Sequence, residues 1–295
     1  MKEAMKDQGV HLALAHRSQL GDGLLWQQAA ARWWWTDVPS ATLYAWSEGS
    51  AAPFACRLPD RVGSFAFCRS GRMLVALAKW LCIADAPTSG ASLPPRHLAL
   101  RPVVAVDPAE PRTRVADGRT DRRGHFVFGT RNEANEARAI GSFYQYSQQH
   151  GLRRLALPAA AVAGSICFSP DGATMYFSDA HARRILQCDY DAAGAQVSNI
   201  RSFAELTDAK PHGAVVDSDG CVWNAEWGGG RLTRYAPDGR RLASWPLPSH
   251  HPTRPAFGGA ALDSLLVSSA ADGLFRLAVP GIRGIPDTPF DDGEL

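Results

Sequence analysis

Three polar turns recur along the chain at a fixed interval, and each is closed by a glycine and followed by a short alternating apolar segment. They are DRRGHFVFGT (121–130), SPDGATMYFSD (169–179) and DSDGCVWNAEW (217–227). Successive turn glycines are 48 residues apart, at Gly124, Gly172 and Gly220. In such a turn, Asp-Gly supplies the positive φ that a tight connection between two strands needs. Looser copies of the pattern give six units in all, the others lying at 28–37, 68–77 and 259–269.

This spacing predicts the fold. Repeats of about 40–50 residues, each built of four strands, are typical of propeller blades, and helical periodicity is scarce in this sequence. We therefore predict an all-β protein, a six-bladed β-propeller in which residues 1–295 form a single domain. In a propeller the inner strand of each blade points its first residues into one mouth of the central channel. The segments expected there are 20–24, 114–119, 162–166 and 210–214.

Composition narrows the class of partner. Hydrophobic residues make up 45% and charged residues 20% of the chain, the profile of a soluble globular protein. A net charge of +2 with scattered arginines argues against a nucleic-acid surface, which needs a basic stripe. No apolar run of about 18 residues predicts a membrane helix, and the first residues lack a signal-peptide core. We expect a cytoplasmic protein whose partner is a small-molecule substrate.

Several conspicuous features have a structural explanation. The six cysteines are scattered without a CxxC pair, which favours buried, reduced thiols. In WWW (33–35), strand alternation sends Trp33 and Trp35 to one face and Trp34 to the other, so we expect packing between blades. The neighbouring His250 and His251 point apart on an extended chain and are expected in a surface loop. No P-loop, dinucleotide-binding or GxSxG motif is present.

Five segments together resemble a known family. They are LGDGLLW (20–26), RVADGRTDRRGHFVFGT (114–130), VAGSICFSPDGATMYFSDA (162–180), KPHGAVVDSDGCVWNAEWGGGRLTRYAPDG (210–239) and PAFGGAALDSLLVSSA (255–270). They are similar to the gluconolactonase and senescence-marker (regucalcin-like) family, and the resemblance covers nearly the whole chain. It implies a six-bladed propeller that hydrolyses sugar lactones with one divalent metal ion.

The resemblance also implies which positions form the site, and most of them are changed here. The family's metal ligands are a glutamate, an asparagine and an aspartate, where this sequence has Asp22, Gly164 and His212. An asparagine and an arginine contact substrate in the family. The asparagine is replaced by Ala116, whereas the arginine is retained as Arg114.

These changes predict that a tight metal site has been lost or weakened. Asp22 keeps a carboxylate but is shorter by one carbon–carbon bond, roughly 1.5 Å, and Gly164 has no side chain. His212 suits zinc or iron better than calcium or magnesium, which prefer oxygen ligands. Only two ligands would remain, whereas catalytic zinc sites usually keep three. If a metal is retained, we expect weakly bound zinc or iron at Asp22 and His212.

Without a metal, the site needs a base and cationic groups. We predict His212 as general base, because imidazole transfers protons near neutral pH, with Asp22 orienting it. Three arginines are predicted to bind an anionic substrate or stabilise an oxyanion, and Asp117 is retained from the family motif as a polar partner. The predicted substrate-binding residues are therefore Arg114, Asp117, Arg131 and Arg254. Each has a structural alternative: a histidine bonded to water, arginines paired with neighbouring acids, and an aspartate capping a turn.

Three functions stay open at this point. The first is a gluconolactonase-like hydrolase acting on a small, oxygen-rich substrate with a lost or weakened metal requirement. The second is a metal-independent isomerase, cyclase or lyase that uses the same acid–base groups. The third is a non-catalytic propeller that binds a small molecule.

Overall fold

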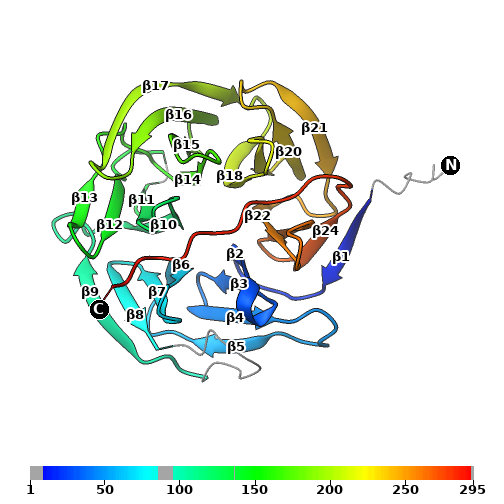
Figure 1. Ribbon diagram of the computed structural model, residues 1–295, viewed down its shortest axis with the longest axis horizontal. Helices are drawn as coiled ribbons and strands as arrows, with labels where there is room; N and C mark the ends of the chain where they lie inside the picture. Colours follow the sequence, from blue (N-terminus) through cyan, green and yellow to red (C-terminus); the bar gives the residue numbers. More distant parts are fainter. Residues whose placement is uncertain (1–8, 86–95, 136, 294–295) are drawn as a thin grey trace.

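The computed structural model describes residues 9–85, 96–135 and 137–293, and in this part of the chain 24 strands form six four-stranded antiparallel sheets. The sheets are arranged radially around a central channel (Figure 1). This confirms the predicted six-bladed β-propeller. The inner strands, which surround the channel, are β2 (Gly21–Gln27), β6 (Val62–Phe67), β10 (Thr113–Thr120), β14 (Ala163–Phe168), β18 (Lys210–Val216) and β22 (Pro252–Gly258).

Each blade continues outward by antiparallel pairing. The second strands are β3 (Arg32–Asp37), β7 (Met73–Leu77), β11 (Phe126–Asn132), β15 (Thr174–Asp179), β19 (Val222–Trp227) and β23 (Ser264–Ser269). The third strands are β4 (Thr42–Trp46), β8 (Trp80–Ala84), β12 (Phe143–Ser147), β16 (Arg184–Asp191), β20 (Arg231–Tyr235) and β24 (Leu274–Leu277). The outer strands are β5 (Phe54–Arg57), β9 (Leu100–Ala105), β13 (Gly151–Arg154), β17 (Gln196–Glu205), β21 (Arg241–Pro246) and β1 (Val10–Leu14).

The ring is closed by the two ends of the chain. β1, the first strand in the sequence, pairs with β24 and completes the blade that begins with β22. The ladder hydrogen bonds between β1 and β24 therefore join the start of the chain to its last blade. A short 3-10 turn, η1 (Gln28–Ala30), lies between β2 and β3.

The repeated turns connect each inner strand to the second strand of its blade. The three turn glycines have positive φ, at 89° for Gly124, 76° for Gly172 and 79° for Gly220. In the last of these turns, the Asp217 side chain accepts hydrogen bonds from the backbone amides of Asp219 and Cys221. Aspartate and glycine thus have separate roles in the turn, since one satisfies backbone donors and the other adopts the left-handed conformation.

The core lies between the blades. Trp33 and Trp35 pack in one cluster with Leu24 and Trp46, whereas Trp34 packs in a different cluster with Phe65. Strand alternation therefore sends the tryptophans to opposite faces of the sheet, as predicted. All six cysteines are buried and unpaired.

A β-bulge interrupts each of the six pairings between inner and second strands in the described chain. The shifts lie at Asp22/Leu25, Val62/Ser64, Val115/Gly118, Gly164/Cys167, Pro211/Ala214 and Pro252/Arg254. A bulge adds one residue to one strand and redirects its side chains. Since every bulge lies near the start of an inner strand, side chains there are turned away from the regular alternation.

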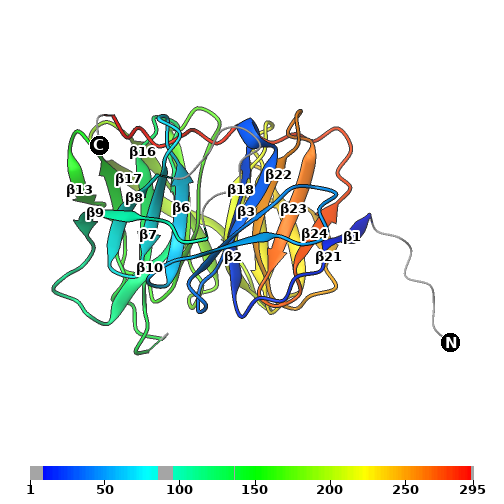
Figure 2. The same cartoon turned by 90° about the horizontal axis from the view of Figure 1, so that it is seen from below.

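The C-terminal segment crosses the end of the channel that lies opposite the starts of the inner strands. Residues 280–293, which we call the strap, run over one face of the disc (Figures 1 and 2). The Gly284 amide donates to the carbonyl of Leu262, and the Phe290 amide donates to the carbonyl of Phe67. The Asp291 amide donates to the carbonyl of Gly124. The strap is thereby fastened to several blades.

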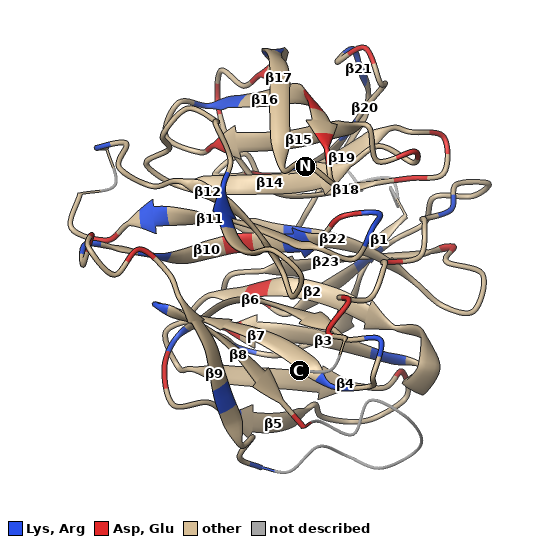
Figure 3. Cartoon of the chain, turned by 60° about the vertical axis from the view of Figure 1, so that its left-hand side comes forward, with Lys and Arg blue, Asp and Glu red and all other residues tan. Residues whose placement is uncertain are grey.

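Charged segments of both signs are interspersed over the ribbon (Figure 3). No helix in the described residues has the length and apolar character needed to cross a membrane.

Candidate active site

All six predicted site residues line one cavity at the end of the channel where the inner strands begin. The cavity measures about 30 Å³ and is bordered also by Ala116 and Gly164, two of the substituted positions. We call this end the charged mouth, defined by Asp22, Arg114, Asp117, Arg131, His212 and Arg254. The structure therefore brings together residues up to 232 positions apart in the sequence, as blade geometry predicted.

Arg254 is the most deeply buried charge of the charged mouth. Its residue surface is 2% exposed, and its Nη2 contacts a carboxylate oxygen of Asp117. Its Nε lies 3.9 Å from Oδ1 of Asp22. Burial lowers the pKa of Arg254, and the neighbouring Asp22 opposes that shift. Arg254 thus stands between two acids as their counter-ion, which is the structural alternative foreseen for the arginines.

Asp117 connects its own blade to two others. Its second carboxylate oxygen accepts a hydrogen bond of 3.0 Å from the backbone amide of Ile166 on β14. Its own strand is β10, and its ion-pair partner Arg254 lies on β22. With three blades joined through one side chain, Asp117 holds the inner ends of the strands in place.

His212 is fixed by its neighbours. Its Nδ1 lies 3.0 Å from the backbone carbonyl of Thr253, and its ring stacks on Trp227 with centroids 5.3 Å apart. A carbonyl oxygen only accepts, so this contact assigns the proton to Nδ1 and leaves the lone pair on Nε2. Oδ2 of Asp22 lies 3.8 Å from Nδ1, beyond hydrogen-bond range. The ring is therefore oriented by Thr253 and Trp227, with Asp22 nearby as a negative charge.

Arg114 and Arg131 face each other across one ladder position of β10 and β11. Arg114 donates through Nε to Glu133 at 3.0 Å and through Nη1 to the carbonyl of Val115 at 2.7 Å. Burial and the adjacent Arg131 lower the pKa of Arg114 to about 10, while Glu133 opposes this shift. Arg131 is half-buried. Glu133 pairs with Arg114 and also with Arg61, so the cations outnumber the acid on this side of the cavity.

The donor set does not fit the metal that the resemblance implies. In the described parts of the chain, no three His, Cys, Asp or Glu side chains come close enough to hold an ion together. Ca²⁺ takes about six to eight oxygen ligands, whereas this cavity offers one carboxylate and one imidazole outside the Asp117–Arg254 pair. The Asp22 carboxylate also accepts from the Gly23 amide and faces the Arg254 guanidinium. Of the three positions that hold the metal in the family, Asp22 faces a guanidinium here, Gly164 has no side chain and His212 offers a nitrogen.

Several contributors were not anticipated from the sequence. Thr253 orients His212 through a backbone carbonyl, which side-chain patterns do not reveal. Trp227 is the last residue of the repeated segment 217–227, and its place in that pattern gives no sign of the contact with His212; it also packs on His251, with ring centroids 4.4 Å apart. Glu133, which pairs with Arg114, was also not anticipated. Its position two residues after Arg131 was the only hint that an acid lies near the arginines.

The chain matches a known family over most of its length. Residues 20–271 match the SMP-30/gluconolactonase/LRE-like region. The chain is 40% identical over 262 residues to an L-arabinolactonase of Azospirillum brasilense, covering 88% of this chain and 83% of that protein. It is 30% identical to a 6-deoxy-6-sulfogluconolactonase of Pseudomonas putida, covering 86% and 84% respectively.

Solved structures show the same architecture. A regucalcin from Agrobacterium tumefaciens superposes with a TM-score of 0.84 at 26% identity, covering 95% of this chain and 96% of that one. A luciferin-regenerating enzyme superposes with a TM-score of 0.87 at 22% identity, covering 96% and 99%. The family match over most of the chain, the relatives at 30–40% identity and the shared propeller lead to one conclusion: this chain belongs to the SMP-30/gluconolactonase/LRE-like family.

Proposed function

We propose that the protein hydrolyses a sugar lactone at the charged mouth, with no divalent cation among the reacting groups. The convergence of His212, Asp22 and the arginines in one cavity is the observation that carries the proposal. Family membership supports it, since two relatives are named as lactonases of sugar-derived lactones. The metal-free character is proposed because the donor set fits cations poorly, for the reasons given above.

The chemistry follows from His212 and the arginines. Nε2 of His212 accepts a proton from a water molecule while the water oxygen adds to the lactone carbonyl carbon. The guanidinium groups of Arg114 and Arg131 stabilise the negative charge on the carbonyl oxygen. The ring C–O bond then breaks, and the imidazolium returns its proton to the departing ring oxygen. One lactone and one water yield one hydroxy acid, and no other reactant is needed.

Binding requires side chains to move. A cavity of about 30 Å³ has room for about one or two water molecules, not for a sugar ring. Arg254 and Asp117 are fixed by burial and pairing. Arg131 is half-exposed at the rim, so we propose that its side chain swings outward and then closes on the substrate.

A hydrolysis assay tests the proposal. Protein dialysed against EDTA is supplied with L-arabinono-1,4-lactone or D-glucono-1,5-lactone, and acid release is followed with a pH indicator. We expect turnover by this protein and a loss of at least about 100-fold in kcat/KM for His212→Gln, the range typical of a general base. His150→Gln is the matched control, because His150 is exposed on a turn away from the cavity.

The outcomes separate the alternatives. Full activity in His212→Gln refutes the assigned base. Activity that EDTA abolishes and zinc restores refutes the metal-free mechanism. If no lactone reacts but sugar acids raise the melting temperature, the protein is a binding propeller. If no lactone reacts and sugar acids leave the melting temperature unchanged, lyase and isomerase substrates are tested instead.

A further inference from the structure

A mostly apolar cavity lies at the other end of the channel, beneath the strap. It measures about 330 Å³ and is lined by the last residues of inner strands and by strap residues 285–289. We call this end the strap mouth, defined by Trp26, Phe65, Arg119, Phe257, Ile285 and Asp287. Small-molecule sites usually have volumes of about 300–1,000 Å³, so this cavity has the size of a ligand pocket.

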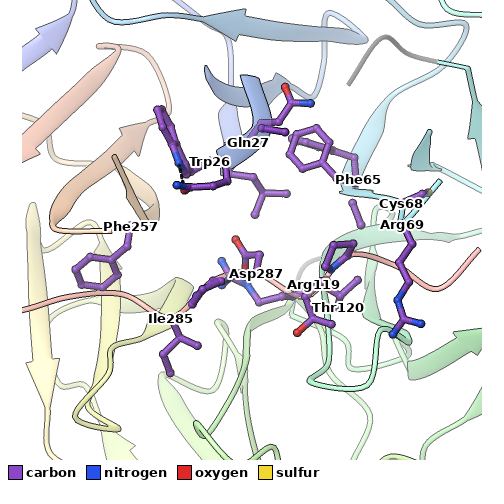
Figure 4. A pocket seen from close by; sticks show the side chains of 18 of the residues that line it. Trp26, Gln27, Phe65, Cys68, Arg69, Arg119, Thr120, Phe257, Ile285 and Asp287 are labelled. Atoms are coloured by element: carbon purple, nitrogen blue, oxygen red, sulfur yellow. Dashed lines mark hydrogen bonds and ion pairs between the residues drawn. The ribbon is translucent and has the colours of Figure 1, made fainter. Parts of the chain in front are cut away.

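Its walls suit an apolar body. Figure 4 shows Trp26 and Phe65 on one side of the cavity and Ile285 with Asp287 on the other. Phe67, Leu25 and Leu262 add further apolar surface. Aromatic side chains favour a flat apolar ligand, which gains contact area and ring stacking. A sugar is disfavoured, because many of its hydroxyl groups would face the apolar part of these walls.

Three charged side chains, Arg69, Arg119 and Asp287, interrupt the apolar lining, and Arg119 is the buried one. Arg119 is 8% exposed, and its Nη1 donates to Oδ1 of Asp287 at 3.0 Å. Its Nε and Nη2 are buried and have no hydrogen-bond partner. These two nitrogens form one edge of the guanidinium plane, the edge that binds both oxygens of a carboxylate. Because unpartnered buried donors are costly, this edge is the natural position for an anionic oxygen pair.

We propose that the strap mouth binds a small organic carboxylate with a flat apolar body. The carboxylate pairs with Nε and Nη2 of Arg119, and the body packs between Trp26, Phe65 and Ile285. Asp287 stays on Nη1, so the ion pair that fastens the strap is kept when the ligand binds. The ligand would rest on β2, β6, β10 and the strap together, and its binding would hold the strap in place.

The strap mouth differs from the charged mouth in position and chemistry. The charged mouth takes residues from the beginnings of inner strands, whereas Trp26, Arg119 and Phe257 stand at or near the ends of β2, β10 and β22. Neither cavity shares a lining residue with the other. The strap mouth is therefore a second site, and its ligand is not the lactone substrate.

Calorimetric titration with matched probes tests the proposal. The probes are 2-naphthoate and its neutral analogue 2-naphthamide, which have the same apolar body. We expect naphthoate to bind at least about tenfold more tightly than the amide. In Arg119→Met/Asp287→Asn, which removes both members of the ion pair and leaves no unpaired charge, we expect that preference to disappear. Arg123→Met, at an exposed arginine of the adjacent turn, is the control and should keep it.

Several outcomes would overturn the proposed carboxylate site. Equal binding of both probes, no binding of either, or a preference that survives in the double variant each overturn the proposal. If the double variant unfolds, Ile285→Trp fills the cavity instead, and it should abolish binding of both probes; unchanged binding also overturns the proposal. The double variant should hydrolyse lactones at the normal rate, so failure here is distinguishable from failure of the proposed hydrolase activity.

Discussion

The two mouths of the channel are built from the same six strands but have opposite characters. The charged mouth is a space of about 30 Å³ in which nearly every charge faces an opposite charge. The strap mouth is about 330 Å³, mostly apolar, and contains a guanidinium edge without a partner. The comparison teaches that cavity size alone does not locate the chemistry, because the smaller space holds the converging acid–base groups.

The difference originates in the strands themselves. β10 has Arg114 as its second residue, carries Asp117 at its bulge and ends with Arg119 and Thr120. β2 has Asp22 as its second residue and ends with Trp26 and Gln27. Most of the charges gather near the bulges, whereas the far ends add aromatic side chains such as Trp26 and Phe257 beside Arg119, so the two ends of the channel differ chemically. The strap then covers the apolar end, where Thr120 donates to the carbonyl of Thr288 at 2.5 Å.

The largest expected effect comes from removing the buried cation of the charged mouth. Arg254→Met leaves the carboxylates of Asp22 and Asp117 without their shared cation. The region is buried, since Arg254 itself is 2% exposed. Breaking a buried ion pair on one side costs about 3–5 kcal/mol, so we expect a loss of that size in the free energy of unfolding. Urea denaturation measures it.

Arg119→Met provides the matched comparison at the strap mouth. Its partner Asp287 retains 31% side-chain exposure, so water compensates for the lost pair and we expect about 1 kcal/mol or less. Arg254→Met/Asp117→Asn should recover part of the larger loss. Equal losses at the two mouths would show that the difference in burial has no energetic consequence.

The next largest expected effect is a gain of stability when a triple variant binds a metal ion. Asp22→Glu, Gly164→Asn and His212→Asp together return the three metal-ligand positions to the residues that the family resemblance implies. A metal at 100 times its Kd then stabilises the fold by about 2.7 kcal/mol, a rise in melting temperature of roughly 5–10 °C. Differential scanning fluorimetry with Ca²⁺ or Zn²⁺ measures it, and this protein should show no such rise.

The gain in stability requires room for a side chain at position 164. A side chain there would place its Cβ 3.0 Å from the carbonyl oxygen of His212 and 3.3 Å from the Ser178 hydroxyl. The neighbouring strand must therefore shift by a few tenths of an ångström. Asp22→Glu/His212→Asp without the asparagine is the control; if it responds to metal as strongly, the absent side chain at Gly164 does not limit metal binding.

Much of the fold could be predicted because its signals are local. A turn with Asp217 and Gly220 determines its own geometry, and the 48-residue interval repeats it. Once the blades were counted, the location of Asp22, Arg114 and His212 around one channel followed from topology. Resemblance to the family then indicated which of the facing positions belong to the site.

The rest depended on contacts that no pattern encodes. The pairing of Arg254 with Asp117 joins residues 137 positions apart in different blades. The strap lies in GIRGIPDTPFDDG, whose prolines and glycines indicate irregular backbone without indicating where it docks. Phe290, fully buried against Tyr146 at a centroid distance of 5.7 Å, was with Ile282 and Ile285 the apolar signal that this tail packs on the propeller.

A smaller effect concerns the position of the base. Trp227→Leu removes the ring that stacks on His212 while leaving the Thr253 carbonyl in place. We expect kcat to fall about tenfold with KM little changed, since a displaced base slows the chemical step without removing a substrate contact. Trp26→Leu is the matched variant at the strap mouth, where it should leave lactone hydrolysis unchanged and weaken naphthoate binding. Loss of activity in both variants would indicate a general effect on stability.

The smallest expected effect tests whether the strap mouth stays covered. Cys68 lines that cavity, and burial, assisted by the nearby Asp292, raises the pKa of its thiol to about 12. A raised pKa keeps the group neutral until the pH approaches that value, so at pH 8 only about one thiol in 10⁴ is the reactive thiolate. We expect almost no reaction of native protein with Ellman's reagent, and reaction of all six thiols after unfolding.

The raised pKa of the Cys68 thiol also means that folding stability falls as pH rises above the ordinary thiol pKa of about 8.5. Rapid labelling of Cys68 in native protein would show that the strap opens, and Cys167 on β14, with a thiol pKa also raised to about 12 by burial, is the internal reference that should stay protected in either case.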